Sequence, residues 1–148
     1  LDTDRMFAEL RSSFETAFEK ENLQLTVSAI QKTVLWDEPQ ILRVLGNLVG
    51  NAREVLQPGP GEVRIAAQDL GNSVRITVAD NGPGLPAVIK QNPFEMFLTK
   101  CKITGSGLGL AICKTIVEAH QGTIHFADNP EGGTIFTIDI PCHPSFRD

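Results

Sequence analysis

Apolar residues recur at helical spacing in three segments of the chain. The first, residues 3–20, predicts an amphipathic helix whose apolar positions are Met6, Leu10, Phe14 and Phe18. The second, residues 38–56, carries Pro39 at its start, where the first turn of a helix accepts proline. The third, residues 107–120, is followed by Gly122, a common stop signal. The pattern therefore predicts three helices distributed along the chain.

Short runs of alternating or β-branched residues predict strands between these helices. The runs cover residues 23–28, 33–36, 62–68, 73–79, 123–126 and 134–140. Gly71 and Asn72 separate the third run from the fourth, which predicts an antiparallel hairpin, and a turn over residues 129–133 separates the last two. We expect one α+β domain over residues 1–148, a two-layer α/β sandwich with about three helices on one face of a mixed sheet of about five strands.

The polar composition excludes several classes of function. A net charge of -5, without a run of Lys and Arg, argues against a nucleic-acid partner. No apolar stretch approaches the roughly 20 residues that cross a bilayer. Cys101, Cys113 and Cys142 are odd in number and form no CxxC pair, which favours reduced thiols without a metal or disulfide role. We therefore expect this domain to be cytoplasmic.

The helix predicted over residues 38–56 has two stripes. Its core face consists of Ile41, Leu45, Leu48, Ala52 and Val55. Asn47, Asn51 and Glu54 are spaced i, i+4, i+7 and form a polar stripe at the border of that face. Asparagine in a helix is usually solvated, but two asparagines beside a core face indicate a ligand or another polar partner.

Two glycine-rich segments contain the candidate chemistry. The first, DNGPGL at residues 80–85, follows a predicted strand, so its aspartate can accept from an exocyclic amine while the glycines let a planar ligand approach the backbone. The second, GSGLGL at residues 105–110, opens a helix, where free amides and the helix dipole suit phosphate. A simple turn or close helix packing would also account for either segment alone. The second segment lacks the lysine of a P-loop and a βαβ unit, which argues against the P-loop and dinucleotide fingerprints.

An ordered set of motifs resembles the GHKL superfamily and, within it, the histidine kinases. RVLGNLVGNA at residues 43–52 resembles the N box, DNGPGL the first glycine box, FEMFLTK at 94–100 the phenylalanine box, and GSGLGLAI at 105–112 the second glycine box. EAHQGTI at residues 118–124 and GGTIFT at 132–137 resemble the closing helix end and final strand of the family. The resemblance covers residues 36–141 and implies the GHKL, or Bergerat, type of sandwich, with residues 86–106 as an ATP lid loop.

The resemblance implies a site for ATP and Mg²⁺. Asn51 would be a ligand of the metal, with Asn47 near the water shell of the metal or the γ-phosphate. Asp80 would accept from the adenine amino group, helped by the Thr134 hydroxyl directly or through water. The expected nucleotide-binding residues are Asn47, Asn51, Asp80, Gly82, Gly84, Leu85, Thr99, Lys100, Gly105, Ser106, Gly107, Leu108, Gly109 and Thr134. Lys100 and Asn47 are the expected catalytic residues, Lys100 because a cation on a loop can neutralise charge on the transferred phosphoryl group.

One position departs from the pattern of the family. Glu54 stands where some relatives carry a lysine or another phosphate-contacting residue, and a carboxylate would repel phosphate unless it met the metal or a cation. Arg53 is adjacent, but helix geometry turns it away from the asparagine stripe. Lys100 also has an alternative interpretation as an ordinary surface lysine. The histidines His120, His125 and His143 are expected to be structural.

The resemblance implies one half of an enzyme. In the family, the γ-phosphoryl group of ATP passes to a histidine on an upstream dimeric helical domain, and then to a receiver aspartate of a response regulator. That helical domain is outside this sequence, so we expect a monomer that binds Mg-ATP but does not autophosphorylate. The parent protein would be a homodimer, and an inner-membrane anchor is compatible with it.

Two other functions are compatible with the sequence. An anti-sigma-type serine kinase of the same superfamily would phosphorylate a small antagonist protein, although GLGLAI and EAHQGTI are more similar to histidine kinases. A non-catalytic, ATP-gated interaction module would instead offer the loop over residues 86–104 as its binding surface.

Overall fold

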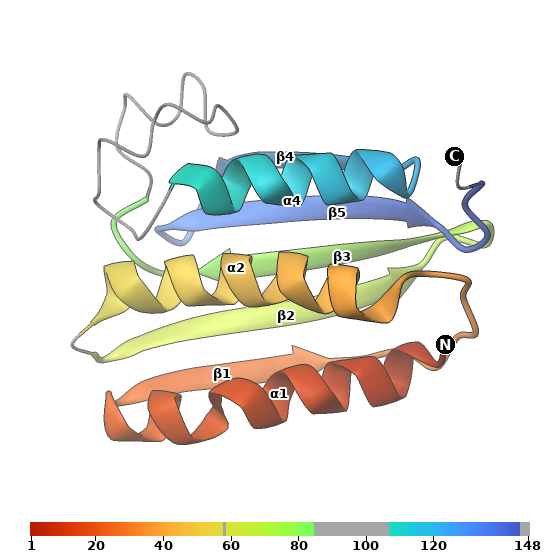
Figure 1. The fold of residues 1–148 in the computed structure, drawn as a ribbon. Helices are drawn as coiled ribbons and strands as arrows, with labels where there is room; N and C mark the ends of the chain where they lie inside the picture. Colours follow the sequence, from red (N-terminus) through yellow and green to blue (C-terminus); the bar gives the residue numbers. More distant parts are fainter. Residues whose placement is uncertain (58, 85–106, 146–148) are drawn as a thin grey trace.

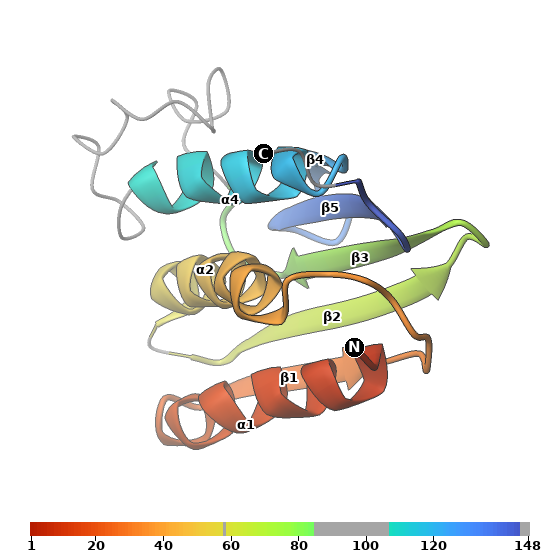
Figure 2. The ribbon, with the colours of Figure 1, turned by 45° about the vertical axis from the view of Figure 1, so that its right-hand side comes forward.

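One mixed sheet and three helices make up the two layers of the computed structural model, which describes residues 1–57, 59–84 and 107–145 (Figure 1). The helices are α1 (Thr3–Lys20), α2 (Glu38–Leu56) and α4 (Gly107–Ala119). The strands are β1 (Leu23–Ser28), β2 (Gly61–Asp69), β3 (Ser73–Asp80), β4 (Thr123–Asp128) and β5 (Thr134–Pro141). Their order in the sheet is β1-β2-β3-β5-β4, with β1 parallel to β2 and the other neighbours antiparallel. The helices lie on the same face of the sheet (Figures 1 and 2). The α+β sandwich expected from the sequence is confirmed.

The segment over residues 33–36 is a correction, because it forms no strand. Its alternation is real, since Val34 and Trp36 are buried and Leu35 is exposed. Its backbone bonds are divided between two ends of the chain: Val34 N–H donates to the carbonyl of Leu1, and Leu35 N–H donates to that of Cys142. Only an isolated bridge forms, between Asp2 and Thr33. Burial alternates here without a continuous ladder.

Both N-terminal helices begin where the sequence supplies a cap. Asp2 accepts from the backbone N–H of Asp4 at the start of α1, and Asp37 accepts from that of Gln40 at the start of α2. Pro39 occupies the first turn of α2, where no backbone donor is needed. These local signals explain why both helices begin close to the predicted residues.

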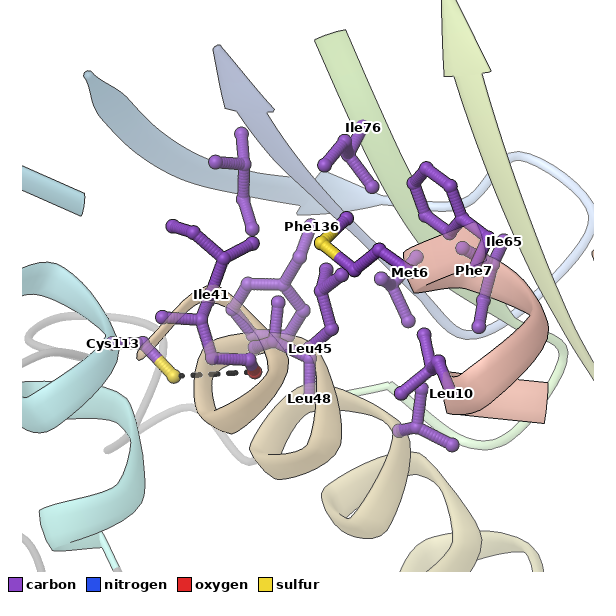
Figure 3. Close-up of a cluster of buried hydrophobic side chains, with 14 of the residues drawn as sticks. Met6, Phe7, Leu10, Ile41, Leu45, Leu48, Ile65, Ile76, Cys113 and Phe136 are labelled. Atoms are coloured by element: carbon purple, nitrogen blue, oxygen red, sulfur yellow. Dashed lines mark hydrogen bonds between the residues drawn. The ribbon is translucent and has the colours of Figure 1, made fainter. Parts of the chain in front are cut away.

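The hydrophobic core lies between the helices and the sheet. Figure 3 shows Met6, Phe7 and Leu10 of α1 beside side chains of α2 and of the sheet. The α2 side chains that the sequence placed on the core face, Ile41, Leu45, Leu48 and Ala52, are buried, and Val55 is half-buried at the end of that face. Burial of this face holds α2 in place against the sheet, with its asparagines at the border of the core.

Pairing between β3 and β5 brings Asp80 of the DNGPGL motif close to Thr134 of the GGTIFT motif. The antiparallel ladder runs to the pair Ala79 and Ile135, so the end of β3 lies beside the start of β5. Asp80 and Thr134 are the next residues at that edge. Asp80 and Thr134, more than fifty positions apart in the sequence, thereby come together beside α2 and α4.

In the described part of the chain, no helix has the length and apolar character needed to cross a membrane.

Candidate functional site

A pocket lies between α2, α4 and the adjoining ends of β3 and β5. Part of it is open to solvent. Its lining consists of Leu48, Asn51, Ala52, Val55, Val78, Asp80, Gly84, Leu110, Thr134 and Phe136. Pockets that are mostly apolar with a few polar groups are typical of small-molecule sites. Four residues predicted from the sequence, Asn51, Asp80, Gly84 and Thr134, are among the lining.

Asp80 is the charged residue among those that line the pocket. Only 7% of its surface is exposed, and its Oδ1 accepts from the backbone N–H of Gly82 at 2.9 Å. Burial raises the pKa of Asp80 above its ordinary value, and hydrogen bonds from the backbone amides of Gly82 and Thr134 partly oppose that rise. In the described part of the chain, no cation lies within ion-pair distance of this carboxylate. Asp80 lines the pocket, so a ligand with a hydrogen-bond donor can reach its carboxylate there.

The walls on either side of Asp80 are apolar. Val78 and Phe136 are paired across β3 and β5 and line the pocket from the sheet. Leu48, Ala52 and Val55 line it from α2, and Leu110 lines it from α4. An apolar pocket lined by one carboxylate suits a heterocycle that carries an N–H donor at its edge.

The two asparagines of α2 have different surroundings. Asn51 is half-buried and lines the pocket. Asn47 lies one turn earlier and is not among the lining residues; its Nδ2 donates to the carbonyl of Gly109 at 3.5 Å. A weak hydrogen bond thus connects Asn47 to the first turn of α4. In this structure Asn47 contacts the helix that would carry phosphate, whereas Asn51 faces the pocket itself.

The side chains of Arg53 and Glu54, at the end of α2, have different surroundings. Arg53 Nε donates to Glu21 Oε1, which ties α2 to the residue that follows α1. Glu54 is exposed, and neither residue lines the pocket. The expectation that Arg53 turns away from the asparagine stripe agrees with this geometry, since Arg53 pairs with Glu21 whereas Asn51 lines the pocket.

The second glycine-rich segment meets the described structure at the start of α4. Gly107 and Leu108 form the first residues of the helix, and Gly109 follows beside Asn47. The free amides at a helix N-terminus, together with the helix dipole, favour an anion there. Leu85, Thr99, Lys100, Gly105 and Ser106 lie outside the described residues, as does the predicted lid over residues 86–106.

A divalent cation at this site would need ligands other than a cluster of protein carboxylates. The described residues contain no group of three or more His, Cys, Asp or Glu that could hold a metal. Asn51 supplies a hard amide oxygen at the pocket wall, and Mg²⁺ commonly combines one or two such protein ligands with water and substrate phosphates. The donor present therefore suits Mg²⁺ that arrives with a phosphorylated ligand.

The buried thiol and imidazole near α4 have structural partners. Cys113 Sγ donates to the carbonyl of Val44 at 3.6 Å (Figure 3), and burial raises the pKa of Cys113 to about 11. His120 Nδ1 lies 2.9 Å from the carbonyl of Ile116, and its Nε2 accepts from the backbone N–H of Asp37 at 3.1 Å. His120 therefore joins the end of α4 to the cap of α2.

Two residues of the β4–β5 turn were missing from the predicted site. Gly133 is buried with φ +91°, and a Cβ there would lie 2.2 Å from the carbonyl oxygen of Asp80. Asn129 Nδ2 donates to that same oxygen at 3.0 Å. Spacing alone could not connect this turn to Asp80, but the glycine pair before Thr134 was a local signal that the backbone makes a close approach there.

The chain matches one protein family over most of its length. The profile of the histidine kinase-, DNA gyrase B- and HSP90-like ATPases matches residues 36–144. The sensor protein KdpD of Escherichia coli is 42% identical over 108 residues, which are 71% of this chain and 12% of KdpD. The histidine-protein kinase BaeS of Escherichia coli is 36% identical over 87% of this chain and 29% of BaeS. Sporulation kinase A of Bacillus subtilis is 37% identical over 85% of this chain and 19% of its own length. The chain thus spans less than a third of each of these relatives.

Solved structures agree with the described fold over nearly its whole length. The catalytic domain of histidine kinase ThkA in a nucleotide-free form superposes with a TM-score of 0.84 at 30% identity, covering 97% of this chain and 98% of that domain. Full-length ShkA in complex with AMPPNP superposes with a TM-score of 0.80 at 25% identity, covering 96% of this chain and 30% of ShkA. The sheet order and the helical layer are therefore those of a known type of catalytic domain.

Proposed function

Because this chain belongs to the family of histidine kinase-, DNA gyrase B- and HSP90-like ATPases, we propose that it is the Mg-ATP-binding catalytic domain of a sensor histidine kinase. Its sequence relatives are sensor kinases of two-component signal transduction, and its structural neighbours are catalytic domains of histidine kinases. ATP would bind in this pocket, and its γ-phosphoryl group would pass to an acceptor histidine outside the chain.

The buried carboxylate of Asp80 carries the proposal. It lines an apolar pocket, has no cation partner among the described residues, and accepts hydrogen bonds from two backbone amides. Adenine presents a flat apolar ring with an amino group at its edge, so the ring would lie between α2 and the sheet while the amine donates to Asp80. Thr134, buried beside Asp80, would offer its hydroxyl to the same polar edge.

The phosphates would extend from the pocket toward the start of α4. The amides of residues 105–109 and the dipole of α4 would neutralise part of their charge, and Lys100 would supply a cation at the γ-phosphate. Asn51 would hold Mg²⁺, which when bound neutralises charge on the phosphate oxygens. Asn47, through its bond to Gly109, would keep α2 and α4 at the spacing that this path requires.

The acceptor and the downstream partner would be separate domains. We assign them as a dimeric helical domain of the parent kinase and the receiver domain of a response regulator. ThkA, a structural neighbour, has been solved in complex with the response regulator protein TrrA, at 28% identity to this chain and a TM-score of 0.77. The parent would be a homodimer, with this domain on the cytoplasmic side if a membrane anchor is present.

The test is calorimetric titration of Mg-AMPPNP, followed by a transfer assay. The wild-type domain should bind the nucleotide, and Asn51→Ala should reduce the dependence of binding on Mg²⁺. Mixed with the helical domain of a compatible histidine kinase, Mg-ATP and a receiver domain, the wild type should yield acid-labile phosphohistidine. Acid-stable phosphoserine on an antagonist protein would favour the anti-sigma kinase, and binding without any transfer would favour an ATP-gated interaction module. Absence of nucleotide binding would contradict all three.

A further inference from the structure

Asn129 begins the turn between β4 and β5 and uses its backbone and side chain to fold it. Its backbone N–H donates to the carbonyl of Gly133 at 2.9 Å, and its own carbonyl accepts from Gly132 N–H at 2.8 Å. Its Oδ1 accepts from the backbone N–H of Glu131 at 3.2 Å. These three bonds close the turn on itself. They leave Nδ2 as the donor with which Asn129 reaches another part of the molecule.

That donor crosses to the end of β3. Asn129 Nδ2 lies 3.0 Å from the backbone carbonyl oxygen of Asp80, 49 positions away in sequence. The β3–β5 ladder ends with the pair Ala79 and Ile135, one residue before Asp80. The side-chain bond therefore continues the connection between the two strands past the last backbone pair, at the residue whose carboxylate faces the pocket.

The backbone of the turn is in contact with Asp80 as well. A Cβ added at Gly133 would lie 2.2 Å from the Asp80 carbonyl oxygen and 2.5 Å from Oδ1. The Thr134 amide, next in the chain, donates to the carboxylate. With so little space between them, a displacement of the turn would displace Asp80 or break its hydrogen bonds.

We propose that Asn129 is a positioning residue for recognition of the adenine amino group, an inference that rests on the proposed function. Asn129 is half-buried and is not among the residues that line the pocket. It acts on the nucleotide through Asp80, by fixing the backbone from which the carboxylate projects. Desolvation opposes an ionised carboxylate at this depth, so a released Asp80 would turn toward water and away from the adenine amine.

The experiment compares ATP with purine riboside triphosphate, which lacks the 6-amino group. Asn129→Asp is nearly isosteric and keeps an acceptor for Glu131 N–H but removes the donor to Asp80. Asn129→Ser also keeps a turn acceptor, adds no charge and is too short to reach Asp80. In both variants the preference for ATP, expressed as the ratio of the two dissociation constants, should fall by about tenfold, as expected for one lost hydrogen bond.

Asn72→Ser is the matched control, because Asn72 occupies the turn at the opposite end of β3. Its nucleotide preference should equal that of the wild type. Equal weakening of both nucleotides in the Asn129 variants would mean that the turn has a structural role only, and would overturn the inference. So would a reduced preference in Asn129→Asp alone, since the added charge would then be the cause. A wild-type domain that binds neither nucleotide would contradict the proposed function first.

Discussion

The β2–β3 hairpin carries the same Asp-x-Gly sequence at both of its ends, and the two aspartates have opposite environments. Asp69 ends β2 and accepts from Gly71 N–H at 2.8 Å, and Asp80 ends β3 and accepts from Gly82 N–H at 2.9 Å. Asp69 pairs with Lys32 at 2.5 Å and about half of its side chain is exposed. Asp80 is buried and has no cation partner among the described residues.

The pKa shifts record this difference. The Lys32 ammonium, and then the Gly71 amide, lower the pKa of Asp69, whereas burial raises the pKa of Asp80. The Lys32 ammonium already neutralises the charge of the Asp69 carboxylate, so a donor from a ligand would add less stabilisation there. A carboxylate that is buried and only partly satisfied costs the free protein stability, and a ligand that brings its own donor recovers part of that cost. This comparison supports the proposal that a ligand binds at the Asp80 end of the hairpin.

Neutralising each aspartate should give the largest contrast. Asp80→Asn presents an amide donor to the adenine amine, so ATP binding should weaken by about 100-fold or more. The same substitution removes a buried charge, so the free energy of unfolding should stay unchanged or rise at neutral pH. Asp69→Asn should leave ATP binding unchanged and lower stability slightly. Calorimetry and urea unfolding measure both effects, and a strong loss of binding in Asp69→Asn would remove the distinction between the two ends.

A methyl group at each turn glycine should give the next largest contrast. Gly133 and Gly71 have nearly equal φ values, +91° and +92°, so alanine is strained at both. A Cβ at Gly71 meets nothing within 4 Å, whereas one at Gly133 overlaps the Asp80 backbone.

Gly71→Ala should therefore cost about 1 kcal/mol of stability without an effect on ATP binding. Gly133→Ala should cost about 2 to 4 kcal/mol and weaken ATP binding by about tenfold or more. Unfolding curves and nucleotide titration of the two variants check this. If both variants lost the same stability and ATP affinity, the contact between residue 133 and Asp80 would have no effect on either property.

Acidification should act on the two aspartates with opposite sign. The folded-state pKa of Asp80 is raised, so its contribution to stability is complete below the unfolded-state pKa and is lost as pH rises through the raised value. The folded-state pKa of Asp69 is lowered, so its contribution is present above the unfolded-state pKa and is lost as pH falls through the lowered value.

Relative to the wild type, Asp80→Asn should gain stability as pH rises from about 4 to 7, whereas Asp69→Asn should show its deficit above the ordinary aspartate pKa. ATP affinity of the wild type should fall several-fold as pH is lowered through the raised pKa of Asp80, since the adenine amine needs an ionised acceptor. Melting temperatures and titrations across this range measure both trends. An ATP affinity independent of pH would show that the ionised Asp80 carboxylate does not contribute to ATP binding.

The smallest effect should come from Arg53→Ala. Arg53 pairs with Glu21 between α1 and α2, and more than a third of its side chain is exposed, so its loss should cost less than about 1 kcal/mol. ATP binding should remain at the wild-type level because Arg53 does not line the pocket. A clear loss of ATP affinity would instead mean that Arg53 reaches the phosphates and offsets the charge of Glu54.

Most of the fold could be predicted from local patterns. Helical spacing, the proline in the first turn of α2 and the turn signal at Gly71 each depend on residues a few positions apart, so the three helices and the β2–β3 hairpin were found close to their observed bounds. The segment over residues 33–36 was assigned wrongly because its alternation reports burial, while strand formation depends on which backbone lies beside it.

For the candidate site, the sequence by itself determined which polar residues stand beside apolar ones: Asn51 at the border of a helical core face, and Asp80 at the end of a strand. It also contained two Asp-x-Gly turns, of which only the one that begins at Asp80 belongs to a motif that resembles the GHKL superfamily. Only the tertiary structure decided that Lys32 reaches Asp69, and that the β4–β5 turn brings Asn129 and Gly133 against Asp80. Burial and charge pairing are set by segments distant in sequence, which come together only when the sheet and the helices pack.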